Sequence, residues 1–171
     1  LRFLCQPPIR DQLEQQALWR ALAGRSLDVI STDHCPHPDE QKQAGADDFT
    51  RTAGGISGIE TRLALMHTFG VRTGQISRPR WVELCCSAPA RLFGLPGKGE
   101  LLPGADADIV LFDPTRQVTL RAATLHSAIP YSQYEDIQVS GYPVTTLSRG
   151  EIIVDDGQFI GQAGRGRFCV R

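Results

Sequence analysis

The stretch Leu27–His34, which reads LDVISTDH, decides the fold class of this sequence. It begins with the short apolar run Leu27, Val29 and Ile30, which predicts a buried strand. The polar residues that follow end this run and place Asp33 just beyond the carboxyl end of the strand. In parallel α/β proteins, ligands and catalytic groups gather at that end, because the loops there converge on one face. Asp33 is therefore a candidate functional residue.

The sequence before this stretch predicts the neighbouring elements of a parallel sheet. Residues 2–5 form another apolar run, stopped by Pro7 and Pro8, and we expect a second buried strand there. Between the two runs, apolar residues recur at helical spacing, with Asp11 as the N-cap and Gly24 at the tail. A strand, a helix and a strand in succession indicate a parallel α/β unit.

A long loop and two further helices are expected next. Residues 35–55 are polar and aperiodic, which predicts a functional or mobile loop. Helical spacing resumes over residues 59–69, with Gly70 as the expected C-terminal cap. Another helix is expected from Ser77 to a limit set by Pro89. The first half of the chain is thus α/β in character.

The sequence changes character after Gly97, where short β-prone runs are separated by Gly, Pro and Asp. Arg149-Gly150 and Asp156-Gly157 are turn signals between adjacent strands, the second of a strong hairpin type. We place a domain boundary near Lys98. The expected strands are residues 109–112, 117–120, 144–147, 152–154 and 158–160.

Composition excludes several classes of partner. Among the 171 residues, 18 basic side chains face 19 acidic ones, so no basic field is available to bind nucleic acid. No apolar run approaches the roughly 20 residues of a membrane-spanning helix. The five cysteines include no CxxC pair, which favours reduced thiols and a cytoplasmic protein, with Cys85 and Cys86 packed in the core. The sequence opens at Leu1 inside an apolar run, and we interpret it as a piece of a longer protein.

A carboxylate placed like that of Asp33 has a specific use in hydrolases. It can ligate a divalent metal and accept a proton from the water that the metal activates, because the metal lowers the pKa of that water toward neutrality. On spacing alone, a helix cap or a turn is an equally good interpretation of Asp33. The spacing leaves both interpretations open.

Motifs along the whole chain resemble those of the cyclic amidohydrolases, the family of dihydropyrimidinases, hydantoinases, allantoinases and dihydroorotases. TDHCPH at residues 32–37, followed by Gln41-Lys42 and Asp48-Phe49, is similar to the family's motif at the eighth barrel strand. The other stretches occur in the family's order, and the tail resembles dihydropyrimidinases and hydantoinases in particular. They are PPIR (7–10), GGISGIETR (54–62), APARLFG (88–94), GADADIV (104–110) and the tail from Tyr134 to Phe168.

This resemblance implies a fold and a metal centre. Residues 1–97 would be the last strands and helices of a (β/α)8 TIM barrel, and residues 98–171 part of a small β-sandwich domain and its tail. The family holds a pair of zinc ions with histidines, a carboxylated lysine and an aspartate, and only the aspartate carries over, as Asp33. Asp33 would also be the catalytic base, which takes a proton from the attacking water and delivers it to the leaving amide nitrogen. His34, beside it, would support the metal site or be structural.

A catalytic zinc needs about three protein ligands, so we expect this chain alone to be inactive. The resemblance also implies substrate contacts. Gln6, before the Pro-Pro pair, and the glycine-rich loop at Ala53, Gly54 and Ser57 would bind a cyclic imide largely through backbone groups. A plain loop with Ser57 as a helix N-cap is the alternative, and both interpretations can hold together. His37 matches the histidine with which dihydroorotases contact an acidic substrate, although a solvated loop histidine is the commoner case.

The expected activity of the intact protein is metal-dependent ring opening of a cyclic amide, such as a dihydropyrimidine or a hydantoin, to an N-carbamoyl amino acid. Allantoinase and dihydroorotase are the alternative enzymes, favoured by PPIRD at residues 7–11 and by His37. A non-catalytic, dihydropyrimidinase-like scaffold is the alternative outside enzymes, and Asp33 argues against it. The expected partners are a small cyclic amide and further copies in a homotetramer or dimer, without nucleic acid or membrane.

Overall fold

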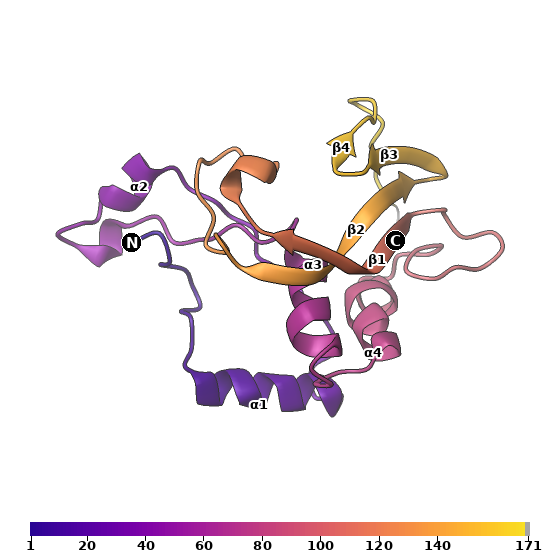
Figure 1. Cartoon of the computed structure of the whole chain (residues 1–171), viewed down its shortest axis with the longest axis horizontal. Helices are drawn as coiled ribbons and strands as arrows, with labels where there is room; N and C mark the ends of the chain where they lie inside the picture. Colours follow the sequence, from indigo (N-terminus) through magenta and orange to yellow (C-terminus); the bar gives the residue numbers. More distant parts are fainter. Residues whose placement is uncertain (170–171) are drawn as a thin grey trace.

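The computed structural model describes residues 1–169 as a mixed α/β chain whose helices precede its sheet (Figure 1). The helices are α1 (Gln12–Ala23), α2 (Asp39–Gln43), α3 (Arg62–Met66), α4 (Arg78–Val82) and α5 (Ala88–Leu92), with single helical turns at Phe49–Arg51 and Ala122–Thr124. The strands are β1 (Ile109–Thr119), β2 (Gln138–Ser148), β3 (Glu151–Asp155) and β4 (Gln158–Phe159).

Helix α1 begins and ends where its sequence predicts. The Asp11 carboxylate accepts a hydrogen bond from the Glu14 N–H at 3.0 Å, which satisfies one of the free donors of the first turn. Gly24 follows the last turn as the C-cap. The inner face of the helix buries Leu22 in the first of two core clusters. That cluster consists of Leu22, Ile76 and Leu84, with Trp19, Ile30, Met66, Val71 and Trp81 packed around it.

Two predicted helix ends are wrong. Helix α3 continues through a wider π-helical turn, His67–Val71, so Gly70 lies inside the helix rather than after it. Gly70 serves packing instead, because a Cβ there would lie 2.9 Å from the Trp19 ring. Likewise α4, which starts at Ser77 as predicted, continues through a similar turn, Glu83–Ser87. It leads into α5, which accommodates Pro89 in its first turn, where a missing N–H costs little.

The two predicted barrel strands are not paired strands within the described part of the chain. Residues 2–5 and 27–30 run without a regular ladder, because a ladder requires a second strand alongside the first. The backbone of residues 27–30 bonds to the helices instead, and the Ile30 N–H donates to the Leu84 carbonyl at 3.2 Å. Ile30 packs half-buried against the first core cluster, but Leu27 is exposed, so this segment is neither paired nor fully buried within the described residues.

The adjacent cysteines Cys85 and Cys86 differ in burial. Cys85 is half-buried, as expected, and its burial raises the pKa of its thiol to about 11. Cys86 is exposed, which corrects the prediction that both pack in the core. Adjacent residues on a helix point about 100° apart, so one apolar face does not take both.

The sheet is an antiparallel meander in the order β1-β2-β3-β4. The predicted runs at 109–112 and 117–120 belong to one long strand, β1, whose register shifts between Asp113 and Gln117. Such an irregularity bends a strand and increases its twist. Residues 1–169 form this single four-stranded sheet, so the expected β-sandwich stays a prediction.

Both predicted hairpin turns are confirmed. Arg149 and Gly150 have φ angles of 49° and 81° between β2 and β3, and Asp156 and Gly157 have φ angles of 44° and 79° between β3 and β4. Positive φ at both central residues matches a type I′ turn, whose twist suits the flanking strands.

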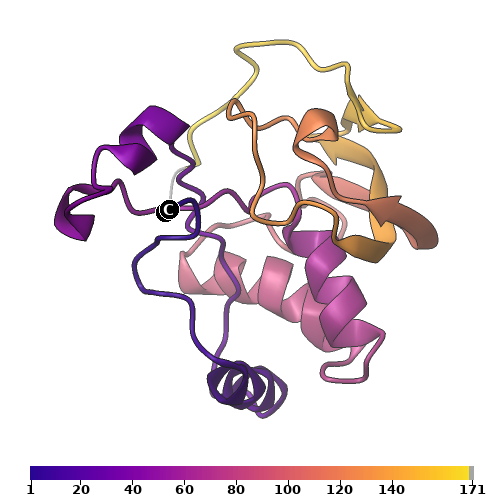
Figure 2. The same ribbon diagram turned by 60° about the vertical axis from the view of Figure 1, so that its left-hand side comes forward.

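The helices pack against the sheet through α3 and β2, and Figure 2 shows α1 on the side of these helices away from the sheet. The second core cluster, Ala64, Leu120 and Val139, lies at this contact. The buried His67 joins the two parts as well, because its Nδ1 lies 2.6 Å from the Ser140 carbonyl oxygen. Among residues 1–169, none of the helices combines the length and apolar character that crossing a bilayer demands.

Candidate active site

Asp33 has an uncommon backbone conformation. Its φ is 42°, in the left-handed region that Asp adopts more readily than most residues, and four other non-glycine residues of the described part share it: Arg25, Asp136, Arg149 and Asp156. Its side chain is exposed and makes no hydrogen bond or ion pair within residues 1–169. A role as a helix cap is wrong, because the next helix, α2, starts only at Asp39. The carboxylate is therefore free to bind a ligand.

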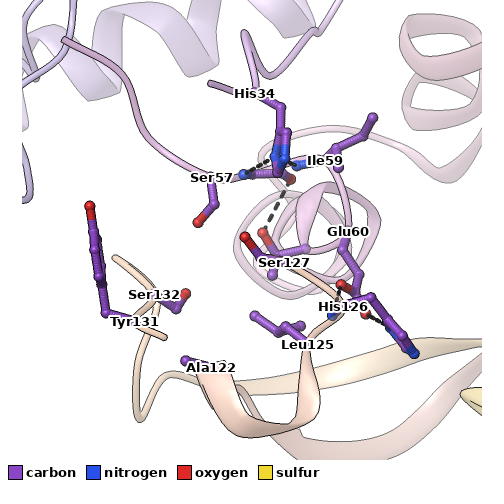
Figure 3. A pocket seen from close by; sticks show the side chains of 12 residues that line it. His34, Ser57, Ile59, Glu60, Ala122, Leu125, His126, Ser127, Tyr131 and Ser132 are labelled. Carbon is purple, nitrogen blue, oxygen red and sulfur yellow. Dashed lines mark hydrogen bonds and ion pairs between the residues drawn. The ribbon is translucent and has the colours of Figure 1, made fainter. Parts of the chain in front are cut away.

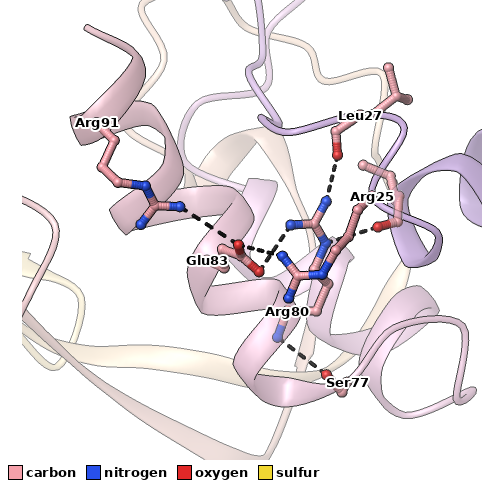
Figure 4. Close-up of polar contacts among 7 residues, drawn as sticks. Arg25, Leu27, Ser77, Arg80, Glu83 and Arg91 are labelled. Atoms are coloured by element: carbon pink, nitrogen blue, oxygen red, sulfur yellow. Dashed lines mark hydrogen bonds and ion pairs between the residues drawn. The ribbon is translucent and has the colours of Figure 1, made fainter. Parts of the chain in front are cut away.

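A buried arginine holds the segment that leads to Asp33 (Figure 4). Arg80 donates from Nε to the Leu22 carbonyl at 2.9 Å and from Nη2 to the Leu27 carbonyl at 2.6 Å. Its Nη1 also lies 3.0 Å from a carboxylate oxygen of Glu83. One guanidinium thus links the end of α1, the start of the 27–30 segment and α4.

Two further arginines extend this support. Arg25 donates to the other oxygen of Glu83 at 2.7 Å, and this bond, with that from Arg80, lowers the pKa of the Glu83 carboxyl. Arg62, in α3, donates to the Ile30 carbonyl at 3.0 Å. The backbone before Asp33 is therefore anchored by side chains from two helices, Arg62 of α3 and Arg80 of α4.

His34 ties the Asp33 segment to the glycine-rich loop (Figure 3). Its Nδ1 accepts hydrogen bonds from the N–H groups of Gly58 and Ile59 at 3.0 and 3.2 Å. Beside it, the Cys35 N–H donates to the Ile56 carbonyl at 3.0 Å, within an isolated parallel bridge of His34 and Ile56. These bonds favour the structural interpretation of His34.

The structure brings two of the predicted substrate-binding positions together. A Cβ on Gly54 would lie 1.7 Å from Oε1 of Gln6, so the Gln6 side chain lies directly against Gly54. The next N–H, that of Gly55, donates to the Leu4 carbonyl at 3.0 Å. Ala53, half-buried, belongs to the same loop. Gln6 and the loop therefore form one continuous surface.

Ser57 is buried but does not cap a helix, which corrects that alternative. Its N–H and hydroxyl both donate to Oε1 of Gln133, at 3.3 and 3.0 Å. Helix α3 starts only at Arg62, and its N-cap residue, Thr61, makes no capping side-chain bond. Ser57 instead joins the loop to the segment before β2.

His37 is surrounded by partners within the chain. Its Nδ1 lies 2.8 Å from Oε1 of Gln41, and its Nε2 lies 3.4 Å from the Cys35 sulfur. Its carbonyl accepts a hydrogen bond from the Tyr131 hydroxyl at 2.6 Å. A substrate contact by His37 stays a prediction, and these bonds give the residue a structural role of its own.

Lys42 also belongs to this site, although its buried position was not predicted from the sequence. Its side chain is fully buried, and its ammonium donates to the Leu4 carbonyl at 2.8 Å and to the Gly55 carbonyl at 2.7 Å. This burial lowers the pKa of the ammonium. A polar, aperiodic loop gives no signal of a buried charge; the one signal was the place of Gln41-Lys42 in the motif.

A cavity lies beside this site and does not include Asp33. It has a volume of about 140 Å³ between the loop that starts at Ser57 and the segment around Ala122–Ser132 (Figure 3). A hydrogen bond between His126 and Glu60, with Nδ1 and Oε1 2.8 Å apart, lies along one side of it. We assign the cavity to the joint between the helices and the sheet.

A metal centre would receive one ligand from the residues that the structure describes. These residues include no group of three or more His, Cys, Asp or Glu side chains that could hold a metal ion. The free carboxylate of Asp33 fits a divalent cation, for which carboxylate oxygens are suitable donors. Neither lysine suits a bridging role, because Lys42 is held by carbonyls and Lys98 by the carboxylates of Asp106 and Asp108.

Comparisons with known proteins define the class to which this arrangement belongs. The model of the amidohydrolase family matches residues 12–153. A D-hydantoinase of Streptomyces coelicolor is 44% identical over 99% of this chain and 37% of its own length. A solved dihydropyrimidinase of Brevibacillus agri superposes with a TM-score of 0.95 at 41% identity, over 97% of this chain and 36% of that one. A Thermus D-hydantoinase (dihydropyrimidinase) gives a TM-score of 0.94 at 39% identity, again over 97% and 36%.

These matches indicate the fold of the TIM-barrel hydrolases, in agreement with the mixed α/β architecture. The chain belongs to the amidohydrolase family. It spans a little over a third of the length of the relatives that it matches, 37% for the Streptomyces enzyme.

Proposed function

We propose that the complete protein is a metal-dependent cyclic amidohydrolase of the dihydropyrimidinase and hydantoinase type. It opens a dihydropyrimidine, a hydantoin or a related cyclic imide to an N-carbamoyl amino acid. The observation that carries the proposal is the free carboxylate of Asp33 at positive φ, beside a glycine-rich loop, in a chain that matches D-hydantoinases over almost its full length.

Asp33 is proposed to act both as a metal ligand and as the catalytic base. Its exposed carboxylate accepts a proton from the attacking water and returns it to the leaving amide nitrogen. Asp33 would be this chain's ligand to a pair of zinc ions, the other ligands, a carboxylated lysine among them, lying outside this chain; the metal would supply Lewis-acid chemistry at the site. An uncompensated carboxylate in a left-handed turn supports this assignment.

The substrate is proposed to lie between Gln6 and the loop of Ala53, Gly54 and Ser57. Backbone N–H and carbonyl groups of these residues would pair with the complementary groups of the cyclic imide. The contact of the Gln6 side chain with Gly54 supports a shared binding surface. His37 is proposed to line this site from the Asp33 segment.

The domain division stays part of this proposal. Residues 1–97 would supply the last strands and helices of the barrel, and residues 98–171 part of a small β-sandwich with its tail. The change from helices to an antiparallel sheet supports a boundary near Lys98. A homotetramer or dimer is supported by large exposed apolar side chains, such as Leu13, Leu101 and Phe168. Free cysteines throughout the described residues support a cytoplasmic location.

The test is ring opening by the full-length protein. The protein is purified, its metal is measured, and the hydrolysis of dihydrouracil and of hydantoin is followed by the appearance of the N-carbamoyl product. We expect turnover of at least one ring, its loss after chelation, and its recovery when zinc is added. Metal-loaded protein that opens neither ring would contradict the proposal; turnover of dihydroorotate or allantoin instead would favour an alternative enzyme, and no turnover of any ring would favour the scaffold.

A further inference from the structure

Burial of the Lys42 ammonium is energetically unfavourable, and this suggests a function for it. It comes from the short helix α2 and is fully buried, although removing an ammonium from water is unfavourable unless hydrogen bonds compensate. The compensation comes from two carbonyls, of Leu4 and Gly55, at 2.8 and 2.7 Å. The buried ammonium thus joins two backbone segments that lie far apart in the sequence.

Both carbonyls belong to the segments proposed to bind substrate. Leu4 lies just before Gln6, and Gly55 lies within the loop 53–57. The two segments also bond directly, because the Gly55 N–H donates to the Leu4 carbonyl at 3.0 Å. Lys42 therefore closes a small ring of hydrogen bonds around the point where the two halves of the surface meet.

The loop 53–57 is tied to other segments through Ile56 and Ser57, but its direct backbone bond to Leu4 is the single one from the Gly55 N–H. Gly55 has a φ of 153°, and a Cβ there would lie 2.3 Å from the Cys35 carbonyl oxygen, so the chain must pass close to Cys35. Glycines fit this passage but do not hold it, since they lose more conformational freedom on ordering than other residues. A donor that reaches both segments at once adds a second restraint at their meeting point.

We propose that Lys42 is a positioning residue for substrate binding: its ammonium fixes Leu4 to Gly55 and so sets the spacing between Gln6 and the loop 53–57. It does not touch the substrate. Instead it orders beforehand the backbone groups that do, so that binding need not order them. This inference rests on the proposed function, which assigns substrate binding to Gln6 and the loop 53–57.

The kinetic test replaces Lys42 in the full-length enzyme by Met, which keeps the shape and removes the donors, and by Arg, which keeps donors. The matched control is Lys98→Met, because Lys98 is the other lysine and pairs with carboxylates beyond Gly97. We expect Lys42→Met to raise KM about tenfold or more with a much smaller change in kcat and in metal content, as loss of uniform binding does. Lys42→Arg should lie closer to the wild type, and Lys98→Met should match it.

A purely packing role would reverse the order of the two variants, because Met fills the buried site better than Arg. An unchanged KM in Lys42→Met, or a KM lower in Met than in Arg, would overturn the proposal while leaving the cyclic amidohydrolase activity intact. An inactive wild type would instead count against the proposed function.

Hydrogen exchange tests the same inference without an activity measurement. In the wild-type protein without substrate, the Gly55 N–H should exchange far more slowly than the amide of Gly104, which lies in the exposed turn at Pro103-Gly104 and donates no backbone hydrogen bond within the described residues. Lys42→Met should lose that protection. Exchange at Gly55 as fast as in the exposed turn would overturn the proposal even if neither Lys42 variant folds.

Discussion

The sheet β1–β4 and the region around Asp33 satisfy their backbone groups in different ways. In the sheet, N–H and carbonyl groups of neighbouring strands pair along regular antiparallel ladders. Around Asp33, the carbonyls of Leu27 and Ile30 accept from arginine side chains, and those of Leu4 and Gly55 accept from Lys42.

The sheet is held by residues that are close together in the sequence, whereas the Asp33 region is held by residues that are far apart in it. A ladder between adjacent strands depends on turns and on many small contributions, so the loss of one costs little. The Asp33 region depends on a few buried cations from helices elsewhere in the sequence, so one substitution removes several bonds at once. We therefore expect single changes to be most damaging around Asp33.

The largest effect on stability is expected from Arg80→Met. It removes donors from the Leu22 and Leu27 carbonyls and a partner from Glu83. Because a hydrogen bond from a charged group contributes roughly 1.5–3 kcal/mol, the free energy of unfolding should fall by about 3 kcal/mol or more. Urea unfolding of the full-length protein measures it.

Arg78→Met is the matched control for this change. Arg78 lies in the same helix, α4, and is exposed, so its replacement should alter the free energy of unfolding by less than about 0.5 kcal/mol. Equal effects of the two substitutions would refute the idea that buried cations hold this region.

A smaller difference in stability is expected between alanine substitutions at two glycines, Gly55 and Gly157. Gly55→Ala would place a Cβ 2.3 Å from the Cys35 carbonyl oxygen, so the loop must move, at about 2 kcal/mol and with weaker substrate binding. Gly157→Ala, at φ 79° in the β3–β4 turn, meets no atom within 4 Å and should cost only about 1 kcal/mol of left-handed strain. Thermal unfolding and KM measure both; a shift in KM for Gly157→Ala would break the contrast.

The smallest effect on stability is expected from protonation of the Glu83 carboxyl at acidic pH. Hydrogen bonds from Arg25 and Arg80 lower the pKa of this carboxyl, so its stabilising contribution is complete above the ordinary value of about 4.5 and disappears as the pH falls through the lowered pKa. Glu83→Gln should therefore lower the midpoint of thermal unfolding at pH 7. The difference from the wild type should shrink as the pH falls below about 4.5; a difference independent of pH would exclude an ionised partner.

The sequence predicts best what short-range chemistry determines. Asp11 as a cap, and Arg149-Gly150 and Asp156-Gly157 as turns, follow from side-chain chemistry and backbone preference within a few residues. Pattern also located Asp33 after an apolar segment, and resemblance supplied its chemistry. The strands predicted at residues 2–5 and 27–30 are not paired within the described residues, because pairing depends on a neighbouring strand that a local pattern does not contain.

The supporting residues escaped prediction for a related reason. A buried Lys42 or Arg80 looks, in sequence, like any solvated charge on a helix, and only the fold brings distant carbonyls to it. Likewise, Gln133 as the partner of Ser57 has no local signal, since 76 positions separate the two. Where a site is assembled from distant segments, the sequence can predict the residue that carries the chemistry, but it does not predict the residues that hold that residue in place.

The central claim, that Asp33 performs the chemistry, is tested most directly by Asp33→Asn in the full-length enzyme, with Asp28→Asn as the control from the same stretch. Asp33 is exposed and makes no bond within the described residues, so the midpoint of thermal unfolding of the metal-free protein should not change. We expect kcat for dihydrouracil or hydantoin to fall at least about a thousandfold, as for other residues of a catalytic centre, and Asp28→Asn to retain wild-type turnover. Turnover by Asp33→Asn within tenfold of the wild type would contradict the claim.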